Sequence, residues 1–237
     1  MTKLLDFVLE AHGGLRRWSD ATTIYATVDM GGPMWASRGQ EGTLSKVGVA
    51  VDVHRQHLVF TDFTAPGLRG VFTPDRVAVE DRDGNVLRER HAPREAYAGH
   101  DRTTPWDQLH VLYFGGYGLW NYLTTPHLLT LPGVRTRELD PWQEAGEQWR
   151  RLHVTFPPHI ATHSTEQTFY YDGSGLLRRQ DYAAFVVGGR AAVHRAEAHR
   201  SVAGLVFPTH RYVLPVIDGR TLSSPGITVD LTDISIE

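Results

Sequence analysis

The chain has 237 residues, of which 41% are hydrophobic and 22% are charged, and its formal net charge is −3. This is the composition of an ordinary globular protein, and it provides no basic surface for nucleic acid. The chain contains no cysteine, which excludes disulfides, thiolate nucleophiles and cysteine metal sites. The length is compatible with one large all-β unit, so we expect a single domain over residues 1–237.

The N-terminal residues 2–12 predict an amphipathic helix that ends at Gly13 and Gly14. This segment has neither the uninterrupted apolar core nor the small-residue cleavage site of a secretion signal. No window of the chain is apolar over the length of a membrane span. We therefore expect a cytoplasmic protein that does not insert into membranes.

Strand patterns follow the first helix between residues 22 and 90. Runs rich in β-branched and aromatic residues occur at 22–30, 43–53, 56–63, 70–72, 77–80 and 86–90. The last two are separated by turn-forming residues at 81–85, which predicts a hairpin.

An aromatic segment at 104–124 predicts the second helical region. Thr104 suits the N-cap, Pro105 suits the first helical position, and Gly115 and Gly116 suggest a bend midway. Helical spacing places a set of aromatic and polar side chains on one face: Trp106, His110, Tyr113, Tyr117, Trp120 and Asn121. We expect this face either to roof a cavity and contact a ligand or to pack in the core.

The C-terminal region, residues 149–237, predicts an antiparallel meander. Its strands are expected at 149–156, 164–171, 176–187, 191–200, 206–216 and 227–236, and they are separated by short turns. Together with the N-terminal strands, this predicts a mainly β (α+β) fold. Its core would be a large curved antiparallel sheet, an incomplete β-barrel with helices covering the concave face.

Two stretches resemble a known family. The opening Ala11-His-Gly-Gly-Leu-Arg-Arg-Trp18 followed by a strand, and the ending Phe207-Pro-Thr-His-Arg211 followed by a terminal strand, are similar to lipoprotein-sorting carriers of the LolA/LolB-like superfamily. The resemblance implies an incomplete antiparallel barrel with helices inside it. It also implies an apolar cavity for acyl chains or other hydrophobic molecules.

Strand alternation predicts a candidate catalytic group in the meander. If residues 188–189 form a two-residue turn and residues 172–175 a four-residue turn, Glu166, Asp181 and His194 share one face with Tyr170 and Phe185. A carboxylate beside an imidazole gives a general base, and a second carboxylate can act as a proton donor. The same three residues could instead form a buried polar network that fixes the sheet.

Other chemical motifs are absent. The thirteen histidines include no His-x-His or His-Glu-x-x-His pattern, so we expect no metal, although a site assembled from separate strands stays open. No glycine-rich phosphate loop, dinucleotide fingerprint or nucleophile elbow occurs, and we expect no cofactor.

Two functions fit these observations. The first is a cofactor-independent enzyme that performs a cyclisation, isomerisation or dehydration on an aromatic, polyketide-like or lipid-like molecule, with catalytic residues His194, Asp181 and Glu166. The second is a non-catalytic intracellular carrier for lipids or hydrophobic metabolites. Polar residues on the predicted cavity face favour the enzyme, because a carrier of apolar chains could dispense with them.

Overall fold

The computed structural model describes residues 2–144 and 146–237. Four α-helices occur among them: α1 (Lys3–Ala11), α2 (Gly14–Asp20), α3 (Pro33–Ser37) and α4 (Gln108–Thr124). Three short 3₁₀ turns are η1 (Glu95–Tyr97), η2 (His127–Thr130) and η3 (Phe185–Val187). The strands of the first half are β1 (Thr23–Gly31), β2 (Val47–Asp52), β3 (His57–Thr61), β4 (Arg69–Phe72), β5 (Arg76–Glu80) and β6 (Val86–His91).

The strands of the second half follow α4. They are β7 (Arg135–Glu144), β8 (Glu147–Thr155), β9 (Glu166–Tyr171), β10 (Leu177–Ala184), β11 (Arg190–Val202), β12 (Leu205–Ile217), β13 (Arg220–Thr221) and β14 (Ile227–Ile236). The strands predicted from alternation and turn residues are all present. The sequence analysis did not predict α3, β7 or β13.

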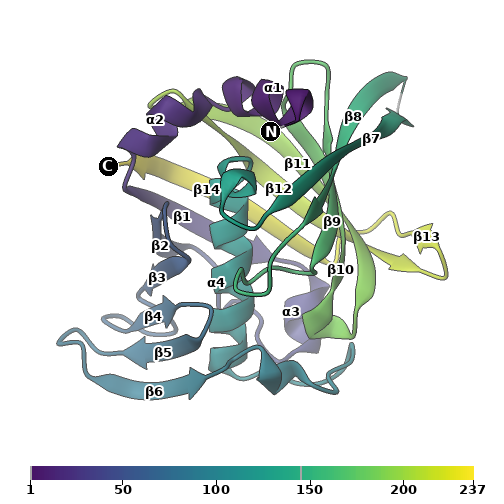
Figure 1. The fold of residues 1–237 in the computed structure, drawn as a ribbon. Coiled ribbons are helices and arrows are strands. Elements are labelled where there is room, and N and C mark those ends of the chain that lie inside the picture. The colour runs from purple at the N-terminus through teal and green to yellow at the C-terminus, as the bar shows by residue number, and fades with distance from the viewer. Residues whose placement is uncertain (1, 145) are drawn as a thin grey trace.

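All fourteen strands belong to one antiparallel sheet in the order β6-β5-β4-β3-β2-β1-β14-β12-β11-β10-β9-β8-β7, with β13 paired to β12. The two halves of the chain meet where β1 pairs with the C-terminal strand β14. The sheet curves around α4, and its two edges, β6 and β7, do not pair with each other (Figure 1). The predicted curved sheet and incomplete barrel are therefore confirmed.

Helix α4 runs through the concave side of the sheet and is buried on nearly all sides. It is one continuous helix, so the predicted bend at its glycines is wrong. The glycines instead permit close packing, since a Cβ atom at Gly116 would lie 2.4 Å from Cγ of Phe72. A side chain at this position would push α4 away from the sheet.

The start of α4 also differs from the prediction. Asp107 is the N-cap, and its carboxylate accepts a hydrogen bond from the His110 N–H (2.9 Å), while the His110 ring accepts one from the Asp107 N–H (3.2 Å). Thr104 does not cap the helix, because its hydroxyl binds the Asp101 carboxylate instead. The two hydrogen bonds between Asp107 and His110 satisfy two backbone N–H groups that the first turn of a helix leaves free.

The two ends of the barrel are built differently. At one end lie α1, α2 and the β11–β12 turn, where Arg17 Nη1 donates to the Ala203 carbonyl (2.9 Å). The opposite end carries the β10–β11 turn and the projecting β12–β14 connection that contains β13 (Figure 1). Within the described residues, none of the helices combines the length and the apolarity needed to span a membrane.

Candidate binding cavity

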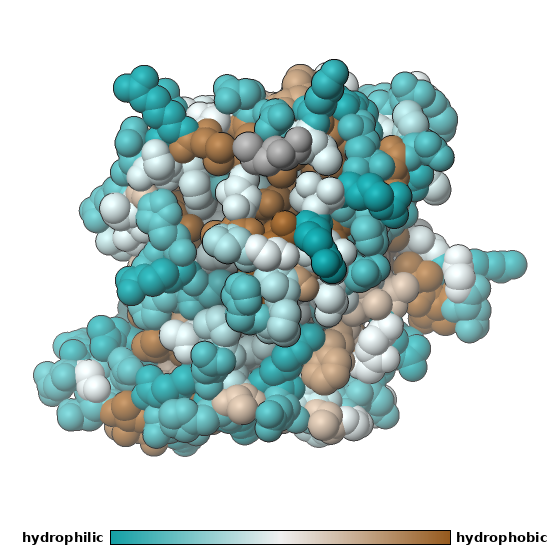
Figure 2. Space-filling model, in the orientation of Figure 1, coloured by the Kyte–Doolittle hydropathy of each residue, from teal (hydrophilic) through white to brown (hydrophobic). Residues whose placement is uncertain are grey.

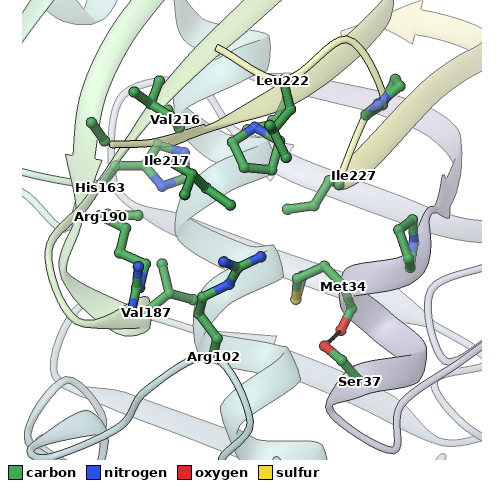
Figure 3. Close-up of a pocket in the computed structure, with 18 of the residues that line it drawn as sticks. Met34, Ser37, Arg102, His163, Val187, Arg190, Val216, Ile217, Leu222 and Ile227 are labelled. Carbon is green, nitrogen blue, oxygen red and sulfur yellow. Dashed lines mark hydrogen bonds between the residues drawn. The ribbon is translucent and has the colours of Figure 1, made fainter. Parts of the chain in front are cut away.

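A cavity of about 670 Å³ opens at the end of the sheet opposite α1 and α2. Its walls come from α3, the β10–β11 turn, the ends of β12 and β14, and the connection between them (Figure 3). Most of the lining is apolar and includes Met34, Val187, Val213, Leu222 and Ile227. The projecting segment around β13 carries apolar side chains beside its hydrophilic tip (Figure 2).

Three rings lie at the inner end of the cavity: Phe114 of α4, Tyr182 of β10, and His163 of the β8–β9 loop. The His163 and Tyr182 rings are stacked, with 4.0 Å between centroids and 7° between planes. The His163 carbonyl accepts a hydrogen bond from the Phe185 N–H (3.1 Å), which ties the loop to the β10–β11 turn. We call these three rings the cavity floor.

Both ring nitrogens of His163 are hydrogen-bonded. Nδ1 lies 3.2 Å from the Tyr117 hydroxyl and Nε2 lies 2.9 Å from the Tyr122 hydroxyl. A neutral imidazole has one donor and one acceptor nitrogen, so one tyrosine donates to the ring and the other accepts from it. Burial, and then the charge of Arg94, lower the pKa of His163 to about 3. The ring is therefore neutral near pH 7.

A second polar group lies behind the floor. The His194 ring is fully buried and 4.6 Å from the ring of Tyr122, and Arg211 Nη2 donates to the Tyr122 carbonyl (3.0 Å). Burial lowers the pKa of Arg211 to about 10. Burial, followed by the charge of Arg211, also lowers the pKa of His194. Neither group lines the cavity.

The structure separates the predicted catalytic pair. His194 pairs with Gln180 and Asp181 pairs with Val193, so His194 points inward and Asp181 outward. The predicted two-residue turn is wrong: η3 and two glycines form a five-residue connection between the paired residues Ala184 and Arg190. The predicted and observed connections differ by an odd number of residues. The pairing of β10 with β11 therefore shifts by an odd number of residues, so residues predicted to share a face lie on opposite faces of the sheet.

Glu166 and Asp181 share a face, as predicted, but it is the outer face. Asp181 accepts hydrogen bonds from Arg179 Nε (2.7 Å) and from the Tyr170 hydroxyl (2.8 Å). The Glu166 side chain is 63% exposed and lies 3.3 Å from His153. The structure therefore does not bring Glu166, Asp181 and His194 together, and Tyr170 faces away from the cavity.

The predicted ligand-contacting residues of the aromatic segment pack in the core. Trp106 contacts Phe114 at 5.2 Å between ring centroids, and Trp120 Nε1 donates to the Asp52 carbonyl (2.8 Å). Asn121 Nδ2 donates to the Ala161 carbonyl (3.3 Å). These positions match the packing alternative, because α4 is enclosed by the sheet and buried on nearly all sides.

The other predicted contact residues also lie outside the cavity lining. His110 caps α4, and the Tyr113 ring packs on Phe72 at 5.9 Å. Phe185 is 41% exposed on η3 beneath the Arg94 guanidinium. Tyr117 contacts the cavity floor, since its hydroxyl is hydrogen-bonded to Nδ1 of His163.

Sequence reasoning missed the residues that do line the cavity. Tyr182 follows Asp181 on β10, so a register that turns Asp181 toward the cavity turns Tyr182 away from it. His163 lies in an irregular loop, where periodicity carries no information. A metal-binding cluster is not formed either, since no three His, Asp or Glu side chains of the described residues converge.

Comparisons with known proteins identify the fold. No protein-family model matches the sequence, and no curated protein matches it. A LolA superfamily protein from Nitrosomonas europaea matches with a TM-score of 0.56 at 10% identity, covering 97% of this chain and 92% of that one. A DUF1329 family protein from Desulfovibrio piger matches with a TM-score of 0.57 at 10% identity, covering 99% and 92%.

A third solved structure, from Vibrio parahaemolyticus, is described as an outer membrane lipoprotein-sorting protein domain. It matches with a TM-score of 0.54 at 11% identity, covering 98% of this chain and 92% of that one. The three matches confirm the LolA-like fold that the N-terminal and C-terminal motifs predicted.

The match to the Vibrio parahaemolyticus structure also corrects the predicted cellular location. The sequence analysis expected a cytoplasmic protein from the character of residues 2–12, and that prediction was wrong, because a structure of this fold is that of an outer membrane lipoprotein-sorting domain. The physical reason is that these residues form α1, whose Leu4, Leu5 and Val8 are buried in the core. Their pattern reports on packing and carries no information about the compartment.

Proposed function

We propose that the protein is a non-catalytic carrier that binds an apolar small molecule in the cavity of about 670 Å³. The observation that carries the proposal is the composition of the lining, which is mostly apolar and includes no aspartate or glutamate. Pockets of roughly 300–1,000 Å³ with mostly apolar walls are typical of small-molecule binding sites. The lipoprotein-sorting description of one structure of the same fold gives independent support.

The alternative of an acid–base enzyme has weaker support. A general base works best when its pKa lies near the pH of the reaction. The pKa of His163 is about 3, and the pKa of His194 is also lowered by burial. Asp181, which was expected to raise the basicity of His194, lies on the opposite face of the sheet. Among the described residues, the cyclisation, isomerisation or dehydration hypothesis therefore loses the acid–base pair on which it depended.

The proposal is tested by blocking the cavity. Ile227 of β14 lines the cavity and is half-buried, and Ile234 is a half-buried isoleucine farther along the same strand, outside the lining. Protein freed of co-purified ligand is titrated with a neutral fluorescent hydrophobe such as N-phenyl-1-naphthylamine. We expect saturable binding of one probe per chain, weakened at least about tenfold by Ile227→Trp, a loss of ~1.4 kcal/mol.

The matched control is Ile234→Trp, which adds the same bulk to the same strand and should leave the affinity unchanged. Equal affinities of the two variants would place the ligand elsewhere. Absence of saturable binding to the unmodified protein would remove the carrier proposal. Native mass spectrometry of freshly purified protein adds a second readout, because a bound molecule should be displaced in Ile227→Trp and retained in Ile234→Trp.

A further inference from the structure

The charged residues of the cavity lining are all of one sign. Arg38, Arg102 and Arg190 line it, and no carboxylate does, although the chain as a whole has a net charge of −3. An apolar pocket with cationic groups and no acidic ones favours a ligand with negative charge. The position of these arginines indicates where on the ligand that charge lies.

Two of the arginines lie at the opening. Arg102 belongs to the segment that precedes α4, and Arg190 begins β11; both are exposed. In Figure 3 both lie on the side of the pocket near Val187, and the Arg102 guanidinium extends toward the space bounded by Met34 and Ile217. Their guanidinium groups are therefore within reach of a ligand whose body fills the cavity.

Neither Arg102 nor Arg190 forms an ion pair with any residue that the structure describes. Elsewhere on the molecule arginines are matched with acids, as Arg179 is with Glu144 and Asp181. The nearest acid in the sequence, Asp101, is engaged locally, because its carboxylate accepts hydrogen bonds from the N–H groups of Thr103 (2.8 Å) and Thr104 (3.0 Å). Two cationic groups at the opening are thus available to an external anion.

Arg38 lies deeper and is 2% exposed. Its Nη1 donates to the carbonyl groups of Asp101 and Thr104, and its guanidinium lies 5.1 Å from the Trp106 ring centroid. Its Nε has no hydrogen-bond partner among the described residues. Arg38 therefore fixes the segment that carries Arg102 and adds positive charge to the same side of the cavity.

The three rings of the cavity floor carry no charge. Phe114 and Tyr182 are aromatic, and His163 is a neutral ring whose two nitrogens are already hydrogen-bonded. Placing an anion there without a charged partner would be unfavourable, because the anion would lose its hydration. An amphiphile would consequently enter with its apolar chain first and leave its charged end at the opening.

We propose that the ligand is an anionic amphiphile: one apolar chain bearing a single carboxylate or phosphate head group, held at the opening by Arg102 and Arg190. This inference rests on the carrier function proposed above and specifies the chemical class of its cargo. Carboxylate and phosphate share the oxygen anions that a guanidinium binds, often with two parallel hydrogen bonds.

The test compares ligands that differ only in the head group. Hexadecanoate, hexadecyl phosphate, hexadecanol and methyl hexadecanoate compete, below their aggregation concentrations, with the neutral fluorescent probe on ligand-free protein. We expect the two anions to bind at least about fivefold more tightly than the two neutral compounds, as two partly exposed ion pairs would provide. The preference should diminish as salt is added, and the tighter of the two anions identifies the head group.

The variant Arg102→Gln/Arg190→Gln should bind all four compounds with the affinity of the neutral ones. The control Arg16→Gln/Arg200→Gln removes two exposed arginines outside the cavity lining and should keep the full preference. Equal binding of anions and neutral compounds by the unmodified protein would overturn the inference, as would a preference that survives in Arg102→Gln/Arg190→Gln. Either result leaves the carrier function standing, whereas failure of all four compounds and the probe would remove both proposals.

Discussion

The imidazole of His163 lies flat on the phenol ring of Tyr182, 4.0 Å away, at the inner end of the cavity. Both rings line the cavity, and the two ring nitrogens of His163 are hydrogen-bonded to the hydroxyls of Tyr117 and Tyr122 on α4. The cavity floor is therefore part of the hydrophobic core. Substitutions at the floor should alter the stability of the fold as well as ligand binding.

Replacing His163 with phenylalanine should destabilise the protein. The variant keeps an aromatic ring for Tyr182 but leaves the buried hydroxyls of Tyr117 and Tyr122 without their partner. Each unsatisfied buried hydroxyl costs about 1–3 kcal/mol, so we expect the two to reduce the free energy of unfolding by about 2–6 kcal/mol. Urea denaturation measures it. A loss below about 0.5 kcal/mol would mean that these hydrogen bonds contribute little.

Stability should fall as the pH decreases from neutral. The pKa of His163 is about 3 in the folded protein, against 6.5 for an unperturbed histidine. Between these values the unfolded chain binds more protons, so the contribution of neutral His163 is complete above pH 6.5 and is lost as the pH falls toward 3. His127, with a pKa of about 3, acts in the same direction.

Each such histidine adds a slope of up to about 1.4 kcal/mol per pH unit in this window. Carboxylates with lowered pKa values, such as Asp101 at about 2, contribute below about pH 5. His163→Gln retains a donor and an acceptor but cannot titrate, so its urea midpoint should depend less on pH between 4 and 6.5. An unchanged slope would show that His163 is not the titrating group.

Two glycines of α4 should respond oppositely to alanine. At Gly116 a Cβ would lie 2.4 Å from Phe72 Cγ, whereas at Gly118 the nearest atom would be 3.9 Å away in Tyr122. Gly116→Ala must displace a buried ring and should cost about 1–3 kcal/mol. Gly118→Ala meets no obstacle and should gain up to about 1 kcal/mol from its helix propensity. Thermal unfolding of the two variants distinguishes them; a stabilising Gly116→Ala would refute the close packing of α4.

Much of the fold could be predicted from the sequence because it depends on local signals. Alternating side chains and turn residues predicted the strands on both sides of α4. Strand β7 was missed because Pro141 breaks its pattern, but β7 is an edge strand with an irregular register between Leu139 and Trp142. A proline that would break a central strand is tolerated there.

The site was less predictable because it depends on loop length. The inward position of His194 and the outward position of Asp181 follow from five connecting residues where two were expected. The cavity walls also include α3 and the β12–β14 connection, neither of which has a periodic pattern. Their positions are determined by tertiary contacts, such as the hydrogen bond from the Met34 N–H to the Gly226 carbonyl (3.0 Å).

The outward acids should be dispensable for ligand binding. Asp181 and Glu166 lie on the outer face of the sheet, where Asp181 binds Arg179 and Glu166 lies beside His153. We expect Asp181→Asn/Glu166→Gln to bind the neutral probe within about twofold of the unmodified protein, which is within ~0.4 kcal/mol. The Ile227→Trp variant is measured in parallel as the control that should lose affinity for the probe. A comparable loss in the acid variant would mean that the ligand contacts the outer face, and that the cavity beside His163 and Tyr182 is not its binding site.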